Sequence, residues 1–232
     1  MHPGSRDLME TVAQWCPACD FPFSRSMGWE RWGVLGVLSD FVLYYNAGNI
    51  LEVGVCESSI FLTKLAKKYS RAAYHCDIQR SVIENCLTVP GYFSDNYKLL
   101  FEGASLDPNT SKVGPGGALI YCGSSDAFFK DITFTPIALC FIDGDHSYEQ
   151  VKKDFWNAFE YIVPNGYIFL HDTYPPNEQY LELNACGTVY KFKQELEQYR
   201  DILEVFTFPR SAWDVGLTVC RKKPSNLPYF KK

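Results

Sequence analysis

The sequence predicts an α/β fold, in which a doubly wound, mostly parallel sheet of seven strands carries helices on both faces. Three observations support this prediction. Short apolar runs suit buried strands, helical apolar patterns lie between them, and two β-rich runs close the chain. Strands that alternate with helices form βαβ units and therefore a parallel sheet. The two final runs have no helix between them, so we expect an antiparallel pair.

The first half of the sheet begins at 49–54, a run of Ile, Leu and Val that ends at a glycine. In 58–69, apolar residues recur with the period of a helix. A second strand is predicted at 72–77 and a second helix at 79–89. The segment 90–117 is rich in Gly, Pro, Asn and Ser and is long for a connection, so we interpret it as an insertion.

The second half repeats this alternation, with strands predicted at 118–122, 137–142 and 167–170. Ser147 begins a helix between the last two, and Gln150 stands three residues later, as in a capping box. A last helix at 189–200 leads to the strand pair at 202–208 and 215–221. This order is that of a Rossmann-like fold. We expect one domain at 46–222, an N-terminal helical cap at 1–45 and a basic tail at 223–232.

Composition excludes several classes of protein. The 232 residues carry 22 Lys and Arg against 27 Asp and Glu, a net charge of −5, which argues against a nucleic-acid binder. No apolar run is long enough to span a membrane, and the first residues lack the pattern of a signal peptide. We therefore expect a soluble cytoplasmic protein with neither nucleic acid nor membrane as a partner.

The chain has nine cysteines. Free cysteine behaves as a small buried apolar residue, and a disulfide framework is uncommon in the cytoplasm. Cys16 and Cys19 form the one paired motif, but the sequence offers no second pair to complete a structural zinc site. Reduced thiols are therefore the favoured interpretation, most of them in the predicted core: Cys56, Cys76, Cys86, Cys122, Cys140 and Cys220.

Polar side chains follow five consecutive predicted strands. Ligands of such sheets bind at the carboxyl ends of the strands, where these side chains would gather. Turns need polar residues, but they do not need so many carboxylates. The residues concerned are Glu52 to Glu57, Asp77, Ser125, Asp126, Asp143, Asp145, His146, His171 and Asp172.

The spacing of these residues favours a ligand that contains a nucleoside. Asp77 stands 23 residues after Gly54, a suitable distance for an acid that binds ribose hydroxyls. A dinucleotide would require GxGxxG, but Cys56 replaces the second glycine and Glu57 would face the phosphates. A nucleoside without phosphates fits better. S-adenosylmethionine is such a ligand, and its sulfonium cation tolerates nearby carboxylates.

Two longer motifs carry a family resemblance. The runs 141–149, with Asp143-Gly-Asp145-His146, and 163–173, with His171-Asp172-Thr173, resemble the class I S-adenosylmethionine-dependent methyltransferases. The chain is most similar to the O-methyltransferase branch that includes sugar- and antibiotic-tailoring enzymes. The resemblance covers about 46–222. The turn at Cys56, Ser58 and Ser59 departs from it, because the family has more glycine there.

The resemblance implies a role for each residue of the cofactor site. Glu52 and Gly54 would shape the pocket for the methionine end, with Cys56 and Glu57 in the same turn. Asp77 would bind the ribose. Ser125 and Asp126 would lie beside the adenine, and Asp143 would also face the cofactor.

The same resemblance places a metal at Asp143, His171 and Asp172 in the metal-dependent relatives. Mg²⁺ prefers oxygen ligands, whereas His171 favours a transition metal, and metal dependence is left open. Asp145 and His146 are the two candidate bases for the hydroxyl proton. Histidine has the more suitable pKa near neutrality, but relatives use either position.

The acceptor is predicted only as a small hydroxylated molecule, such as a sugar, polyketide or phenol. Residues 1–45 and 174–187 would cover the pocket with aromatic side chains. Trp213 lies in the final hairpin, often an oligomer surface in such folds, so a homodimer is a further expectation. Two alternatives compete with a methyltransferase. One is a nicotinamide-dependent oxidoreductase, and the other is a non-catalytic binding protein, which the altered turn 56–59 would suit.

Overall fold

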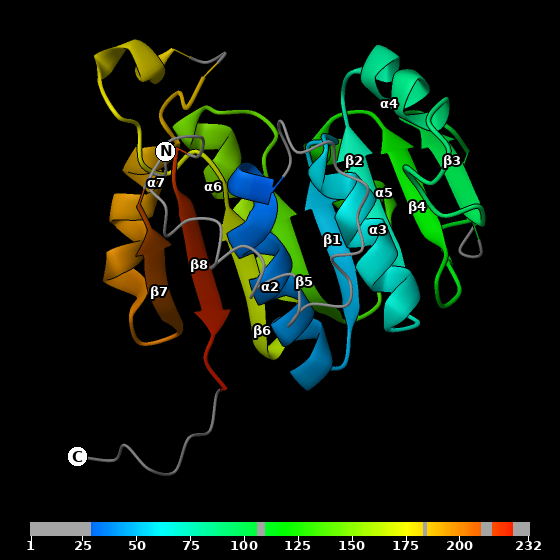
Figure 1. Ribbon diagram of the computed structural model, residues 1–232, viewed down its shortest axis with the longest axis horizontal. Helices are drawn as coiled ribbons and strands as arrows, with labels where there is room; N and C mark the ends of the chain where they lie inside the picture. Colours follow the sequence, from blue (N-terminus) through cyan, green and yellow to red (C-terminus); the bar gives the residue numbers. More distant parts are fainter. Residues whose placement is uncertain (1–28, 106–109, 183–184, 210–214, 225–232) are drawn as a thin grey trace, which may run out of the picture.

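The computed structural model describes residues 29–105, 110–182, 185–209 and 215–224. Its strands form one sheet in the order β3-β4-β2-β1-β5-β6-β8-β7 (Figure 1). The six strands from β3 to β6 in this order run parallel, and β8 pairs antiparallel with both β6 and β7. The strands are β1 (Asn49–Val53), β2 (Ala73–Asp77), β3 (Tyr97–Phe101), β4 (Ala118–Cys122), β5 (Ile137–Ile142), β6 (Ile162–Leu170), β7 (Leu203–Phe208) and β8 (Leu217–Lys222). The predicted fold class is confirmed.

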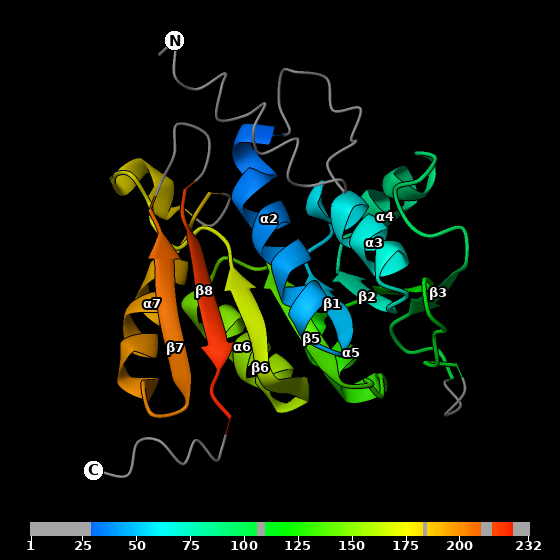
Figure 2. The ribbon, with the colours of Figure 1, turned by 60° about the horizontal axis from the view of Figure 1, so that its bottom comes forward.

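Helices cover both faces of the sheet. One face carries α2 (Trp29–Tyr45), α3 (Ser58–Lys68) and α4 (Arg80–Leu87), and the other carries α5 (Ser125–Asp131), α6 (Tyr148–Tyr161) and α7 (Val189–Leu196) (Figures 1 and 2). Short 3-10 helices at Glu178–Leu181 and Glu197–Tyr199 complete the described elements.

Neighbouring residues of one strand supply the two halves of the core. Ile50 packs among apolar side chains of α2 and α3, whereas Leu51 packs among those of α5, α6 and α7. Successive side chains of a strand point to opposite faces, so a strand that is covered on both sides is apolar throughout. This explains why the central strands appear in the sequence as continuous apolar runs.

Within the part of the chain that the structure describes, the sheet has eight strands, so the prediction of seven is wrong by one. The additional strand is β3, inside the segment 90–117, where it forms the sheet edge beside β4. Its five residues are partly or fully exposed. This short strand lies among the many Gly, Pro, Asn and Ser residues of 90–117, and this composition predicted an insertion instead of a strand.

Helix α2 lies within the segment predicted as an N-terminal cap. Its Leu35, Val42 and Leu43 are buried in the core on the face of α3. The described part of that segment thus packs on the sheet itself. The remainder, residues 1–28 with Cys16 and Cys19, lies outside the described residues, as do Trp213 and the tail from 225.

Two further sequence predictions concern the thiols and the membrane. The seven cysteines of the described ranges form no disulfide bonds with one another, and six of them are buried. Among the helices described, none combines the length and the apolar character that crossing a bilayer requires.

The point at which the sheet reverses its direction of winding lies between β1 and β5. From β1 the chain proceeds outward to β2, β3 and β4, and it then returns to β5 on the other side of β1. In an open α/β sheet, the loops that leave the carboxyl ends of the strands at such a point form a crevice. Here these loops begin at Gly54 and Asp143.

Candidate active site

The turn after β1 is built on a glycine that no other residue can replace without rearrangement. Gly54 has φ +90°, outside the range that L side chains favour. A Cβ atom there would overlap the Asp143 carbonyl oxygen and would lie 2.8 Å from the Gly144 Cα. Gly54 therefore lets the loops after β1 and β5 touch, backbone to backbone.

Glu52 anchors the same turn from below. Its side chain is fully buried, and its carboxylate accepts hydrogen bonds of 2.6 Å from the hydroxyls of Ser58 and Ser59. A third contact of 2.6 Å joins it to Nδ1 of buried His75 on β2. The structure thus places Glu52 on the buried side of the turn, where it ties the turn to α3 and β2. Ser58 and Ser59, where the sequence departs from the family, supply two of its three donors.

The other residues of the turn lie nearer the surface. Glu57 is exposed at the start of α3, and Cys56 is partly exposed, with its Sγ 3.5 Å from Asp143 Oδ2. Asp77, at the end of β2, accepts a hydrogen bond of 2.9 Å from the Val55 backbone N–H and another of 2.6 Å from that of Gln79. Asp77 therefore holds the turns after β1 and β2 together, and burial raises its pKa.

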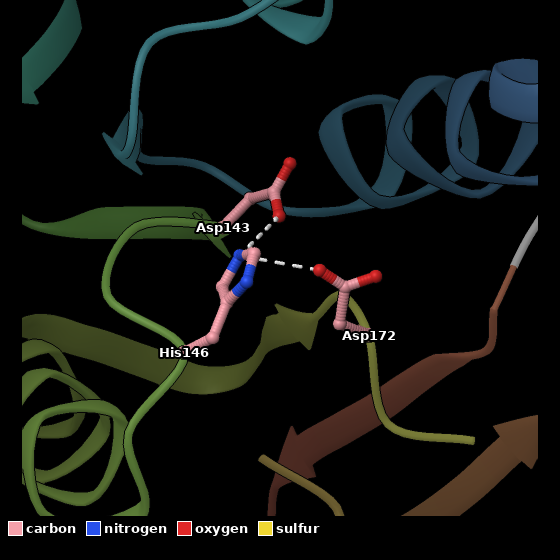
Figure 3. Close-up of side chains that lie close together, drawn as sticks. All are labelled: Asp143, His146 and Asp172. Carbon is pink, nitrogen blue, oxygen red and sulfur yellow. Dashed lines mark ion pairs between the residues drawn. The ribbon is translucent and has the colours of Figure 1, made fainter. Parts of the chain in front are cut away.

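Two aspartates and one histidine lie close together at the ends of β5 and β6. His146 Nε2 lies 3.2 Å from Asp172 Oδ2 and 3.7 Å from Asp143 Oδ1 (Figure 3). One ligand atom from each of the three residues falls within 4.8 Å of the others. Asp172 has φ +58°, a conformation that aspartate tolerates better than most residues. Such backbone strain often marks a functional site.

His171 lies behind this cluster. Its side chain is 4% exposed, and its Nδ1 is 3.0 Å from Asp143 Oδ1 and 3.2 Å from Asp172 Oδ1. The sequence grouped His171 with these two aspartates as metal ligands. In the structure His146 joins the group instead, and the His171 ring supports both carboxylates from the buried side.

Charge explains the protonation states of the cluster. Burial alone would raise the pKa of Asp143, but the charge of His171 and the hydrogen bonds from His146 and His171 outweigh burial and hold that pKa well below its usual range. Contact with Asp143 raises the pKa of His146, burial opposes this, and the charge of Asp172 adds to the increase. The carboxylates therefore stabilise the imidazolium form of His146 once its neutral ring has taken up a proton.

Part of the predicted cover returns to this cluster. Gly187 packs so closely that a Cβ there would overlap the His146 carbonyl oxygen, and the Thr188 backbone N–H donates to that oxygen at 2.8 Å. Cys186 is buried, with its Sγ 3.9 Å from Asp172 Oδ1. These contacts fix the backbone of His146. They would have been invisible in the sequence, because they join segments 40 residues apart.

Asp145 differs from its neighbour His146. It is exposed, and its Oδ1 accepts a hydrogen bond of 2.7 Å from the Ser147 backbone N–H just before α6. The structure therefore brings His146 into the carboxylate cluster and leaves Asp145 at its rim.

The cluster suits a divalent cation by its donor chemistry. Two carboxylates are oxygen ligands of the kind that Mg²⁺ and Mn²⁺ accept, and an imidazole extends the choice to Zn²⁺ or Fe²⁺. His146 Nε2 faces both carboxylates, which is the orientation a shared ion requires (Figure 3). Asp143, His146 and Asp172 therefore fit a metal ion.

Ser125 and Asp126 begin α5, at the end of β4. The residue that caps α5 is Ser124, which accepts a hydrogen bond from the Ala127 N–H. Both Ser125 and Asp126 instead contact the Gln150 side chain of α6, at 3.0 and 3.2 Å from its Nε2. The sequence pattern predicts Gln150 only as part of the cap of α6. Its backbone N–H does bond to Ser147, but its side chain serves this second purpose.

Comparison with known proteins now defines the class. A family model described as a methyltransferase domain matches residues 51–173, more than half of the chain, so the chain belongs to this family of methyltransferase domains. The match spans β1 to the loop after β6 and thus includes Gly54, Asp143 and Asp172. A search of curated proteins finds no match.

Solved structures share the fold. The O-methyltransferase TomG from Streptomyces achromogenes, involved in tomaymycin synthesis and solved with S-adenosylmethionine, aligns with a TM-score of 0.59 at 14% identity, covering 93% of this chain and 89% of TomG. An O-methyltransferase from Bacillus cereus, solved with S-adenosylhomocysteine, aligns with a TM-score of 0.60 at 15% identity, covering 94% and 91%. At this identity the likeness is one of fold.

Proposed function

We propose that this chain transfers a methyl group from S-adenosylmethionine to a hydroxyl of a small molecule. The observation that carries the proposal is the His146 imidazole, 3.2 Å from the Asp172 carboxylate at the carboxyl ends of β5 and β6, next to the switch point between β1 and β5. This is a suitable base beside the crevice in which a methyltransferase domain would hold its cofactor. Solved structures of similar fold include O-methyltransferases that contain S-adenosylmethionine or its product.

The cofactor would lie across the ends of β1, β2 and β4. Gly54 lets the first turn pack against the Asp143 backbone. The methionine end of the cofactor would bind at this turn. Asp77 would accept hydrogen bonds from the ribose hydroxyls, and Ser125 and Asp126 would border the adenine. The carboxylates of Asp143 and Glu57 suit the sulfonium charge.

The chemistry is an in-line displacement at carbon. The acceptor oxygen forms a bond to the methyl carbon while the bond from carbon to sulfur breaks, and S-adenosylhomocysteine leaves. His146 Nε2 takes the hydroxyl proton, and the Asp143 and Asp172 carboxylates stabilise the imidazolium that results. Positioning of the acceptor supplies a further share of the rate.

A divalent metal, Mg²⁺ or a transition metal, is the second component of the proposal. When bound at Asp143, His146 and Asp172, it would act as a Lewis acid that lowers the pKa of the acceptor hydroxyl. His146 Nε2 cannot both coordinate an ion and accept a proton, because both need the same lone pair. With an ion bound there, Asp145, the exposed carboxylate beside the cluster, would be the candidate base.

Binding and turnover together test the function. Calorimetry of the full chain should give micromolar binding of S-adenosylmethionine and S-adenosylhomocysteine and no binding of NAD. Release of S-adenosylhomocysteine is then followed with a panel of sugars, polyketides and phenols. NAD binding without binding of either sulfur ligand would overturn the proposal. Cofactor binding without turnover on any acceptor would indicate a binding protein instead.

Two variants distinguish the two bases. After chelation of metal, His146→Ala should reduce kcat by about 10²- to 10⁴-fold, whereas Asp145→Asn should stay near the wild-type rate. With added Mg²⁺, Mn²⁺ or Zn²⁺, an enzyme that uses the metal should gain rate and become sensitive to Asp145→Asn. Full activity of His146→Ala under both conditions would exclude His146 as base and as ligand.

The buried thiols, which form no disulfides with one another, support a cytoplasmic setting in this proposal. The acidic net charge supports a small-molecule acceptor over a nucleic acid. The homodimer predicted from the final hairpin belongs to the same proposal. It is tested by the mass of the particle in light scattering.

A further inference from the structure

Helix α6 carries a buried polar pair that the proposed mechanism does not use. Asp154 is 1% exposed, and its Oδ1 accepts a hydrogen bond of 3.0 Å from Gln150 Nε2, one helical turn earlier. Its Oδ2 is buried and has no hydrogen-bond partner in the described structure. Burial of a carboxylate with one unpaired oxygen costs free energy, so this arrangement needs a physical explanation.

The Gln150 amide connects this acid to the cofactor side of the sheet. Its nitrogen lies within hydrogen-bond distance of three acceptors, Asp154 Oδ1, Ser125 Oγ at 3.0 Å and Asp126 Oδ1 at 3.2 Å. An amide nitrogen has two hydrogens, so the three acceptors share them. Bonds to a charged acceptor are stronger than bonds to a neutral one, so ionised Asp154 holds the amide in place.

We propose that Gln150 and Asp154 are positioning residues for the adenine side of the cofactor site. Asp154 acts by fixing the Gln150 amide, which in turn fixes Ser125 and Asp126. This inference rests on the proposed function, because it assumes that S-adenosylmethionine binds beside these two residues. Asp154 itself is 1% exposed, so it would act through Gln150 and not by contact with a ligand.

Protonation of Asp154 gives the proposal a measurable signature. Burial raises the pKa of Asp154 to about 6, although the neighbouring Ser125 hydroxyl and Gln150 amide lower it and the charges of Asp126 and Asp145 raise it further. The other groups that face it are the thiols of Cys76 on β2 and Cys140 on β5. Below pH 6 the neutral carboxyl holds the amide less firmly, and the cofactor should bind more weakly.

The experiment measures the dissociation constant of S-adenosylhomocysteine for the full chain between pH 5.5 and 8. Loss of one charge-assisted hydrogen bond weakens binding about tenfold. At pH 5.5 about three quarters of Asp154 is protonated, so wild-type binding should be about threefold weaker than at pH 7.5. Asp154→Asn, which carries no charge at either pH, should bind about tenfold more weakly at pH 7.5 and lose this part of the pH dependence.

A control variant separates Asp154 from other titrating groups. His146 also has a perturbed, raised pKa, but it is present in every variant, so the difference between wild type and Asp154→Asn isolates Asp154. Glu160→Gln makes the same change from acid to amide at an exposed position of the same helix. It should leave both affinity and pH profile unchanged.

A double-variant cycle tests the route through Gln150. Gln150→Leu should weaken binding by a similar factor, and adding Asp154→Asn to it should have little further effect. Equal affinities and parallel pH profiles of wild type and Asp154→Asn would overturn the inference, as would fully additive losses. If Asp154→Asn does not fold, Gln150→Leu alone must abolish the pH dependence assigned to Asp154. Absence of wild-type binding at every pH would refute the proposed function instead.

Discussion

Gly54 is the residue on which the geometry of the crevice depends most directly. Gly54→Ala combines an unfavourable φ with overlap of the Asp143 carbonyl oxygen. The overlapping atoms belong to the backbone of Asp143 and Gly144, so relieving the overlap would require the backbone after β5 to shift. We expect a loss of about 3 kcal/mol or more in the free energy of unfolding, together with loss of cofactor affinity. Urea denaturation and calorimetry measure the two effects.

Gly91 provides a matched control for this substitution. Its φ is +75°, but a Cβ there would meet nothing within 4 Å. Gly91→Ala should therefore cost only the strain of its backbone conformation, about 1 kcal/mol, and leave cofactor binding intact. Equal losses for the two variants would show that conformation alone, without the contact to Asp143, accounts for the role of Gly54.

At the scale of elements, Glu52 joins three of them. Its carboxylate on β1 accepts hydrogen bonds from two serine hydroxyls of α3 and contacts the imidazole of His75 on β2. All of these side chains are fully buried. Glu52→Gln keeps the shape but places an amide donor against other donors, and an unsatisfied buried polar group costs about 1–3 kcal/mol. Thermal and urea unfolding should report a loss of this size.

Glu84→Gln is the corresponding control for Glu52→Gln. Glu84 lies in an exposed pair with Arg80 on α4, and exposed pairs contribute little to stability. The same change from acid to amide should thus leave the unfolding midpoint unchanged. A stable Glu52→Gln variant would mean that the network relaxes around the amide.

The elements also show which features the sequence can specify. The central strands and α6 could be predicted from the sequence, because their buried faces require a regular pattern of apolar residues and α6 also has a capping serine. The edge strand β3 was not predicted. Its side chains are partly or fully exposed, and it lies in a segment rich in turn residues. In the site, Asp143 and Asp172 could be placed by the rule that parallel strands end together. The choice between His146 and His171 could not, because it depends on contacts of Gly187 and Thr188 across the loops.

For the whole molecule, the dependence of the free energy of unfolding on pH is the sum of contributions from groups whose effects oppose one another. Asp143 has a lowered pKa, so it stabilises the fold above the unfolded value of about 4, and this contribution is lost as pH falls. His146 has a raised pKa, so it stabilises the fold below about pH 6.5, and this contribution is lost as pH rises through the folded value. Asp154 opposes Asp143, although both are carboxylates.

The contribution of Asp154 can be measured without any ligand. Its folded pKa of about 6 lies above the unfolded value of about 4, so the folded state gains stability when Asp154 is protonated and loses it as pH rises through 6. Between pH 7.5 and pH 5, the free energy of unfolding of wild type should therefore increase by about 1 kcal/mol relative to Asp154→Asn. Urea denaturation at both pH values measures this difference, and contributions of Asp143 and His146 cancel in it. Parallel changes in the two proteins would place the pKa of Asp154 near its unfolded value. The buried carboxylate would then be ionised at little cost, and the weaker cofactor binding expected below pH 6 would lose its physical basis.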